Sequence, residues 1–184
     1  MIISELLNSG SKILKNNKIK SHQLDAELVL SNLLKKKREN LLINLNQEVS
    51  KSIVDKFNKL IFRRSTREPL VYIFKNKEFW SKDFFVNRNT LIPRPETELL
   101  CENVVKILKN KNLYILDIGT GTGCILLSIL SEIKGGTGIG IDISKKAIEV
   151  AKKNSNKLGL NKRAKFFTKS LDDIYGYKFD SPQT

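Results

Sequence analysis

The stretch Ile115-Leu116-Asp117-Ile118-Gly119-Thr120-Gly121-Thr122-Gly123-Cys124-Ile125 decides the fold of this chain. It begins in a short apolar run, residues 113–117, which is typical of a buried parallel strand. The three glycines that follow predict a turn whose backbone can lie close to a ligand, because glycine lacks a Cβ atom and tolerates positive φ. Residues 124–133 predict a helix. A strand, a glycine turn and a helix in this order form the nucleotide-binding half of a doubly wound α/β sheet.

The spacing of the glycines separates two classes of cofactor. A dinucleotide fingerprint, Gly-x-Gly-x-x-Gly, requires a glycine where this chain has Cys124, so a nicotinamide dehydrogenase is the least favoured interpretation. The pattern here is Asp-x-Gly-x-Gly-x-Gly, the form that holds S-adenosylmethionine by its amino-acid part and ribose. Asp142 ends the next apolar segment and is placed to accept hydrogen bonds from both ribose hydroxyls. The expected cofactor-binding residues are Asp117, Gly119, Thr120, Gly121, Thr122, Gly123 and Asp142.

Composition sets further limits. The chain has 184 residues and a net charge of +14, from 33 Lys and Arg against 19 Asp and Glu. A polyanionic partner would explain the charge, but the lysines are dispersed, so we do not expect direct nucleic-acid binding. No apolar run approaches the ~20 residues of a membrane span, and residues 1–5 carry no export signal, which predicts a cytoplasmic protein. Cys101 and Cys124 lack metal-ligand spacing and are expected to be reduced thiols.

Residues 1–68 predict a small helical bundle, because their amphipathic helices can bury their apolar stripes only against each other. A bundle without catalytic residues next to a cofactor domain indicates a substrate-recognition module. Ser21 and Ser50 are expected N-caps. The bundle offers no catalytic constellation, and His22 is expected to have a surface role. The expected stripes are Ile3, Leu6, Leu7, Ile13 and Leu14 in the first helix, Leu24, Leu28 and Leu33 in the second, and Ile53, Phe57, Leu60, Ile61 and Arg64 in the last.

Residues 69–92 predict a β-hairpin linker, with strands at 70–74, 78–80 and 84–86 that are rich in aromatic and β-branched residues. Residues 93–184 predict the cofactor domain. Its first helix, running to about Lys109, would start at Pro95 and Glu96, where a missing N–H costs nothing and an acid faces the helix dipole. Its expected core face is Leu100, Val104, Ile107 and Leu108. Capping does not explain Arg94, which lies beside these residues.

Several segments together resemble one family, the HemK/PrmC glutamine N5-methyltransferases that act on peptide-chain release factors. They are Asp25-Ala26-Glu27, Arg63-Arg64, Glu68-Pro69-Leu70, Glu78-Phe79-Trp80, Phe85-Val86, Leu91-Ile92-Pro93-Arg94-Pro95-Glu96-Thr97-Glu98, residues 115–123 and Asp142. The resemblance covers nearly the whole chain, and the Pro-Arg-Pro-Glu-Thr-Glu segment is its most specific part. It implies an α/β protein: a helical bundle, a β-hairpin linker and a partial Rossmann-like class I S-adenosylmethionine-dependent methyltransferase domain.

The resemblance also implies a reaction and a partner. A methyl group would pass from S-adenosylmethionine to the side-chain amide of the glutamine in a Gly-Gly-Gln loop of a release factor. The bundle would dock the release factor, with association to the ribosome left open, and Arg94 and Glu96 would lie near the pocket. Asp172, one place later than the family's acidic residue, would lie near the adenine. No metal is implied.

One departure from the family is large. The catalytic Asn-Pro-Pro-Tyr motif should follow Asp180, but the chain reads Ser181-Pro182-Gln183-Thr184, so no catalytic residue is assigned. We therefore expect a cut or frameshifted, nearly inactive form in which residues 113–117 become an exposed edge strand. Two other functions stay open. One is an adenine or cytosine N-methyltransferase, which uses a similar glycine loop on flipped bases. The other is a non-catalytic module that binds release factors or ribosomes.

Overall fold

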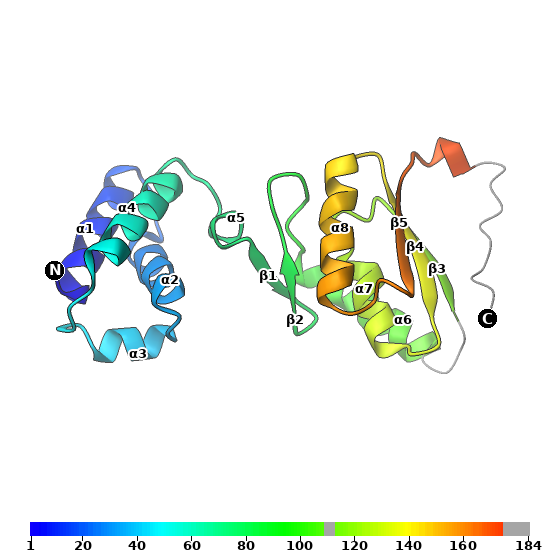
Figure 1. Cartoon of the computed structure of the whole chain (residues 1–184), viewed down its shortest axis with the longest axis horizontal. Coiled ribbons are helices and arrows are strands. Elements are labelled where there is room, and N and C mark those ends of the chain that lie inside the picture. Colours follow the sequence, from blue (N-terminus) through cyan, green and yellow to red (C-terminus); the bar gives the residue numbers. More distant parts are fainter. Residues whose placement is uncertain (109–112, 175–184) are drawn as a thin grey trace. The chain divides into compact units, whose positions relative to one another are not determined.

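The computed structural model describes residues 1–108 and 113–174 and divides into two compact units, Met1–Phe74 and Lys75–Thr184. The first unit contains only helices among its elements (Figure 1): α1 (Ile3–Asn16), α2 (His22–Leu34), α3 (Arg38–Ile43), α4 (Lys51–Ser65) and α5 (Leu70–Phe74). Its core is a single apolar cluster drawn from α1, α2, α3 and α4, so the predicted helical bundle is confirmed. The fully buried members of that cluster include Ile3, Leu6, Leu14, Ala26, Leu30, Leu41, Phe57 and Ile61.

Two predicted stripe positions of the bundle are wrong. Ile13 is 39% exposed and Leu24 is 44% exposed. In α1 the buried position is instead Gly10, where a Cβ atom would lie 2.6 Å from Cζ of Phe57. The close approach of α4 to this glycine rotates the contact face of α1 away from Ile13.

Of the two predicted N-caps of the bundle, the one at Ser50 is confirmed and the one at Ser21 is wrong. The hydroxyl of Ser50 accepts a hydrogen bond from the Ile53 amide at 3.4 Å, which confirms its cap. The hydroxyl of Ser21 caps no amide and donates instead to Oδ2 of Asp25 at 3.0 Å. The backbone of Ser21 has φ of −83° and ψ of 23°, outside the extended region that an N-cap residue typically adopts.

The first predicted strand of the linker is also wrong, because residues 70–74 form α5. The amides of Tyr72 and Ile73 donate to the carbonyl of Pro69, which begins a helical turn. Ile73 is buried, and Leu70 and Phe74 pack against the core of the bundle. That i, i+3, i+4 spacing buries one helical face, and this packing outweighs the strand propensity of the aromatic and β-branched side chains.

The second unit has an antiparallel hairpin and a parallel sheet. Its elements are β1 (Asn76–Phe79), β2 (Lys82–Phe85), η1 (Pro95–Thr97), α6 (Glu98–Leu108), β3 (Tyr114–Ile118), α7 (Cys124–Glu132), β4 (Thr137–Asp142), α8 (Lys145–Lys157), β5 (Ala164–Thr168) and η2 (Asp172–Ile174). The parallel strands are ordered β3-β4-β5, with α7 and α8 on one side of the sheet (Figure 1). The α/β class predicted from the glycine stretch is confirmed.

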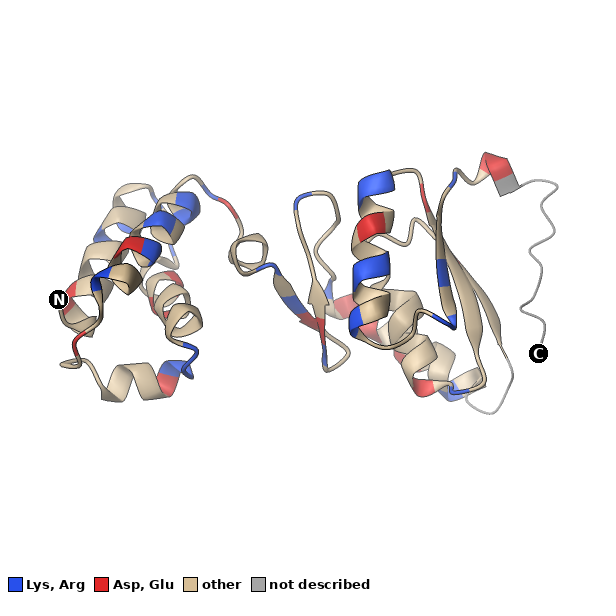
Figure 2. Ribbon diagram, viewed as in Figure 1, with Lys and Arg blue, Asp and Glu red and all other residues tan. Residues whose placement is uncertain are grey.

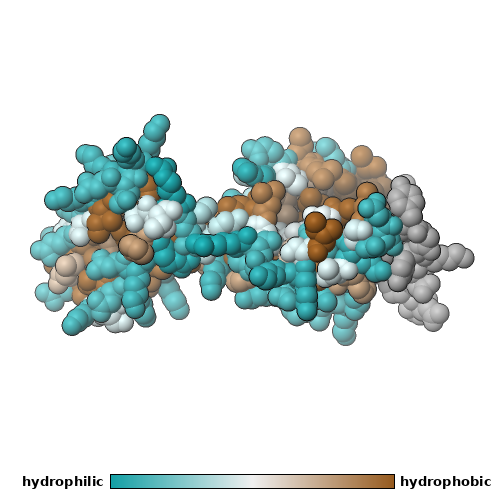
Figure 3. Space-filling model, turned by 90° about the horizontal axis from the view of Figure 1, so that it is seen from above, coloured by the Kyte–Doolittle hydropathy of each residue, from teal (hydrophilic) through white to brown (hydrophobic). Residues whose placement is uncertain are grey.

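Within the described residues, β3 is an edge strand, as predicted. It pairs only with β4, in a register that places Leu116 beside Ile139 and Ile118 beside Ile141. Leu116 is 38% exposed and Ile118 is 51% exposed, because the helices cover the opposite face. Apolar surface of this unit is visible in Figure 3.

The hairpin predicted as a linker lies within the second unit, so the structural division at residue 74 differs from the predicted boundaries at 68 and 92. The physical reason is burial: Phe79 and Phe84 belong to the core of this unit and meet edge to face, with ring centroids 6.1 Å apart. Trp80 and Ser81 make the turn with φ of 54° and 51°, the left-handed values of a two-residue hairpin turn.

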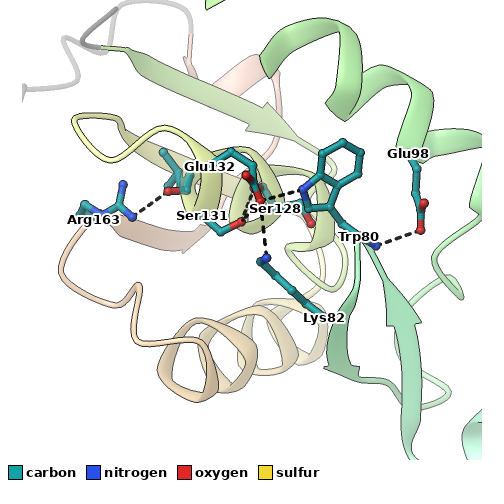
Figure 4. A network of polar contacts seen from close by, with 8 residues as sticks. Trp80, Lys82, Glu98, Ser128, Ser131, Glu132 and Arg163 are labelled. Atoms are coloured by element: carbon teal, nitrogen blue, oxygen red, sulfur yellow. Dashed lines mark hydrogen bonds and ion pairs between the residues drawn. The ribbon is translucent and has the colours of Figure 1, made fainter. Parts of the chain in front are cut away.

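Side chains from α6 and α7 hold this turn (Figure 4). The amide of Trp80 donates to Oε1 of Glu98 at 2.9 Å, and its indole Nε1 donates to Oε1 of Glu132 at 3.1 Å. Lys82 lies 3.7 Å from the same Glu132 oxygen. At the same carboxyl end of α7, Arg163 donates to four backbone carbonyls, those of Leu130, Ile133, Lys134 and Gly136.

The predicted core face of α6 is confirmed at Val104 and Leu108 and wrong at Leu100 and Ile107. Cys101 is fully buried, and Val104 and Leu108 pack beside it, whereas Leu100 is 50% exposed and Ile107 is 73% exposed. Residues 95–97 form the 3-10 turn η1, so the α-helix begins at Glu98. Across the described ranges, no helix has the length and apolar character to cross a membrane, and no cluster of side chains could hold a metal ion.

Candidate functional site

The glycine loop lies at the carboxyl edge of the sheet, between β3 and α7. Gly119, Gly121 and Gly123 have φ of 73°, 54° and 77°, so each adopts a conformation that other residues rarely tolerate. The amides of Gly119 and Thr120 both donate to the carbonyl of Ile141 at 2.9 Å, which ties the loop to β4. The loop is therefore preformed by its own backbone.

Asp142 ends β4, as predicted, and its carboxylate faces the loop. Oδ2 accepts from the Gly121 amide at 3.0 Å, and Oδ1 accepts from the Ser144 amide at 2.9 Å. A carboxylate oxygen can accept two hydrogen bonds, so each oxygen retains a further lone pair. The residue is partly exposed. Asp142 is thus oriented by two backbone amides and can still accept two hydroxyl donors.

Asp117 lies in β3, two residues before the first glycine of the loop. Its Oδ2 accepts from the hydroxyl of Thr120 at 2.7 Å. Burial raises the pKa of the Asp117 carboxyl above its ordinary value, and the nearby charge of Asp142 raises it further, while hydrogen bonds from Thr120 and the Leu126 amide act in the opposite direction. Two acidic side chains therefore face one loop, next to the amino end of α7.

The glycines at this edge serve two different purposes. A Cβ atom on Gly119 would meet nothing within 4 Å, and one on Gly121 would meet only a backbone oxygen at 3.9 Å. These two glycines border open space. By contrast, a Cβ on Gly123 would lie 3.2 Å from the Phe166 ring, and one on Gly140 would lie 2.6 Å from it. The open side of the loop, with the free lone pairs of Asp142, fits an adenosyl cofactor.

The remaining predicted site residues lie as follows. Thr120 and Thr122 are buried within the loop. Arg94 precedes η1, Glu96 lies in it, and both are exposed. Asp172 is exposed in η2, just after β5. Among the residues that the structure describes, no hydrogen bond joins these last three to the loop, and the expected position of the Asn-Pro-Pro-Tyr motif lies outside the described residues.

One residue of this site, Asn154 of α8, was not predicted from the sequence. Its side chain is fully buried and donates to the carbonyl of Thr122 in the glycine loop at 2.9 Å. The available signal was its position: Asn154 follows the inner-face residues Val150 and Ala151 at helical spacing, so a polar amide falls on the buried side of the helix. A buried amide requires hydrogen-bond partners, and here one of them is the loop.

This fold and this glycine loop define a class I S-adenosylmethionine-dependent methyltransferase domain. Comparison with known families gives the same class: residues 109–181 match a methyltransferase domain, and residues 5–74 match the PrmC N-terminal domain. Residues 5–74 thus resemble the N-terminal domain of the PrmC family, and a methyltransferase domain follows them in the chain.

Three relatives illustrate the likeness. The release factor glutamine methyltransferase of Buchnera aphidicola subsp. Schizaphis graminum is 43% identical over 143 residues, which cover 78% of this chain and 52% of the relative. That of Leptospira interrogans is 38% identical over 92% of this chain and 60% of its own length. A bifunctional methyltransferase of Rickettsia typhi is 34% identical over 97% of this chain and 38% of its own. The chain therefore spans about 40 to 60% of the length of these relatives.

Proposed function

We propose that this chain supplies the cofactor site and the substrate-recognition bundle of a release factor glutamine methyltransferase of the cytoplasm. The methyl donor is S-adenosylmethionine, and the acceptor is the side-chain amide nitrogen of the glutamine in the Gly-Gly-Gln loop of a release factor. The names of the Buchnera and Leptospira relatives support this choice of substrate. The helical unit, which matches the PrmC N-terminal domain, is the part that docks the release factor.

The single observation that carries the proposal is the arrangement of Asp142 against the glycine loop. Its two oxygens are fixed by the amides of Gly121 and Ser144 at 3.0 and 2.9 Å, and their second lone pairs remain available. In this proposal those lone pairs accept the two ribose hydroxyls, while the loop from Gly119 to Gly123 holds the methionine end. A dinucleotide fingerprint would require glycine at the position of Cys124, so the glycine spacing favours an adenosyl cofactor over NAD.

Such a site catalyses chiefly by positioning. An amide nitrogen is a poor nucleophile because its lone pair is delocalised into the carbonyl group. Transfer then depends on holding the donor and acceptor in line and on stabilising the charge that develops. The described residues account for the donor side, through the preformed loop and Asp142. Arg94 and Glu96 remain proposed neighbours of the acceptor glutamine, and Asp172 a proposed neighbour of the adenine.

The test separates cofactor from substrate. Calorimetry should show that the 184-residue chain binds S-adenosylhomocysteine and fails to bind NADH. A release factor with its Gly-Gly-Gln loop should be retained by the immobilised chain, and a variant with a charge reversal on the loop's flanks should be retained less. A folded chain that binds no adenosyl ligand would refute the proposal. Retention of an oligonucleotide in place of the release factor would favour a nucleic-acid methyltransferase. The expectation that this form transfers no methyl group stays a prediction, checked with a radiolabelled donor.

A further inference from the structure

Asn154 joins three separate parts of the α/β unit through one buried side chain. Its Oδ1 accepts from the Phe85 amide at 2.7 Å, and its Nδ2 donates to the Phe85 carbonyl at 3.0 Å and to the Thr122 carbonyl at 2.9 Å. Phe85 ends β2 of the hairpin, Thr122 lies in the glycine loop, and Asn154 itself lies on α8. The residue is 0% exposed, so these bonds are formed without competition from water.

The chemistry of the contact admits only the amide in this orientation. Nδ2 has two N–H donors, and both point at carbonyl oxygens, which can only accept. Oδ1 faces the Phe85 N–H, which can only donate. If the amide were turned over, its oxygen would face two carbonyl oxygens, and its N–H₂ group would face the N–H of Phe85. The three partners therefore require the side chain of asparagine, and a carboxylate of the same shape cannot replace it.

The contact with Thr122 fixes one peptide plane of the loop at both ends. The carbonyl of Thr122 and the amide of Gly123 belong to the same planar peptide. Asn154 holds the carbonyl, and the amide donates to the Thr120 carbonyl at 2.7 Å. With this plane fixed, Thr122 and Gly121 cannot rotate freely, so the open face of the loop keeps one shape. Preorganised backbone donors bind a ligand without an ordering cost.

Neighbouring residues of α8 hold the hairpin without touching the loop. Nζ of Lys153 lies 3.5 Å from the centroid of the Phe85 ring, and Nζ of Lys157 donates to the Asp83 carbonyl at 2.7 Å. Docking of the hairpin on α8 is thus shared by several residues. Among the described hydrogen bonds, only the one from Asn154 connects α8 to the glycine loop.

We propose that Asn154 is a positioning residue that sets the shape of the glycine loop for the methionine end of the cofactor and couples that loop to the hairpin. This inference rests on the proposed function, because it concerns the same cofactor. Loss of Asn154 should lower the affinity for ligands that carry the amino-acid part. It should leave unchanged the affinity for ligands that contact only the adenosine side of the site, near Asp142.

The first experiment compares two ligands on the 184-residue chain. S-adenosylhomocysteine carries the amino-acid part, and methylthioadenosine lacks it. For Asn154→Asp and Asn154→Ser we expect the affinity for S-adenosylhomocysteine to fall by about tenfold or more, the effect of one or two lost hydrogen bonds. Affinity for methylthioadenosine should change by less than about twofold. A general loss of folded protein would lower both affinities alike, so the ratio of the two is the readout.

Two control variants separate the loop from its surroundings. Lys153→Met removes the cation over Phe85 and keeps the amide, so the ratio should stay at the wild-type value. Ser155→Ala replaces a buried hydroxyl that has no hydrogen-bond partner among the described residues, one position further along α8, and should likewise leave the ratio unchanged. An unchanged ratio in both Asn154 variants would overturn the inference while leaving the proposed function intact.

A second experiment needs no substitution at Asn154 and applies even if those variants do not fold. Hydrogen exchange of the wild-type chain is measured with and without S-adenosylhomocysteine. The amide of Phe85 should exchange more slowly when the ligand is bound, because its acceptor is the side chain that holds the loop. The amide of Val86, which donates to the Lys75 carbonyl at 3.3 Å, should change much less. Equal responses of the two amides, or none at Phe85, would contradict the coupling. If the wild-type chain binds neither ligand, the proposed function fails, and this inference fails with it.

Discussion

The buried acidic residues of the helical unit and the two acidic residues at the glycine loop of the α/β unit have different kinds of partner. In the helical unit, Asp25, Glu27 and Glu68 are 5%, 4% and 7% exposed, and each is paired with an arginine. In the α/β unit, Asp117 and Asp142 accept hydrogen bonds from amides and a hydroxyl, and within the described residues neither forms an ion pair. Figure 2 shows acidic and basic residues distributed over both units.

This difference separates structural from ligand-binding acids. An arginine neutralises a carboxylate and occupies its lone pairs, as the guanidinium of Arg63 does by contacting both oxygens of Glu68 at 2.8 and 2.6 Å. A backbone amide orients a carboxylate but leaves its charge and a second lone pair available. The family resemblance treats Asp25, Glu68 and Asp142 alike as characteristic residues. The structure assigns the first two to the bundle's own stability.

The largest expected effect comes from removing one of the arginine-paired acids of the helical unit. Asp25→Ala leaves Arg64 without the carboxylate that its Nε contacts at 2.7 Å, and it removes the acceptor of the Ser21 hydroxyl. Because the side chain of Arg64 is only 19% exposed, we expect a loss of about 3 kcal/mol in the stability of the helical unit. Urea unfolding followed by far-ultraviolet circular dichroism measures it.

The chain provides an internal reference for this measurement. Trp80 is the only tryptophan and lies in the α/β unit, so its fluorescence reports the unfolding of that unit. The fluorescence transition should stay in place while the dichroism transition of Asp25→Ala moves to lower urea. Asp55→Ala, at an exposed position of α4, should shift neither by more than about 0.5 kcal/mol. A wild-type dichroism curve for Asp25→Ala would show that the ion pair is not structural.

The next largest effect concerns Asp142, an acid that is oriented by backbone amides. Asp142→Asn keeps the shape of the side chain but presents an N–H₂ group to one of the two amides that now donate to it. Affinity for S-adenosylhomocysteine should fall by about 100-fold, the effect of losing two hydrogen bonds to a charged acceptor. Affinity for methylthioadenosine should fall in parallel, because both ligands have the ribose. Calorimetry tests this; a loss confined to S-adenosylhomocysteine would move Asp142 away from the ribose.

The sequence predicted best what depends on neighbouring residues. The glycine loop, the end of β4 at Asp142 and the cap at Ser50 follow from local backbone requirements, and the structure confirms each. A positive φ at three positions strongly favours glycine whatever packs around the loop. The α/β class followed from the same stretch. The assignment of ligand atoms to these residues stays a prediction.

Features that depend on distant contacts were predicted poorly. Residues 70–74 have strand-forming side chains, but the bundle core selects a helix. The buried face of α6 is set by its contact with α7, which hydrophobic spacing alone does not identify. The role of Asn154 depends on Phe85 and Thr122, which are 69 and 32 residues away in the sequence. A single sequence does not show which distant residues lie in contact, so these pairings could not be predicted from it.

The smallest expected effect has the opposite sign. Because burial raises the pKa of Asp117, the folded protein holds this proton more tightly than the unfolded chain does. Its contribution to stability is therefore fully present at pH values below the ordinary carboxyl pKa, and it is lost as pH rises through the raised one. Asparagine has no proton to lose and can still accept from the Thr120 hydroxyl. Asp117→Asn should thus match the wild type in acid and stabilise the α/β unit at neutral pH, as followed by Trp80 fluorescence in urea.

A matched substitution shows whether this pH dependence belongs to the buried acid. Glu149→Gln also removes one carboxylate, but at an exposed position of α8, so its stability relative to the wild type should not vary with pH in this way. If Asp117→Asn instead destabilises the protein at neutral pH, the charge of Asp117 must be satisfied within the fold, as the charges of Asp25 and Glu68 are in the helical unit. That outcome would weaken the contrast between the two units, because a carboxylate without an arginine partner would then contribute to stability as the arginine-paired ones do.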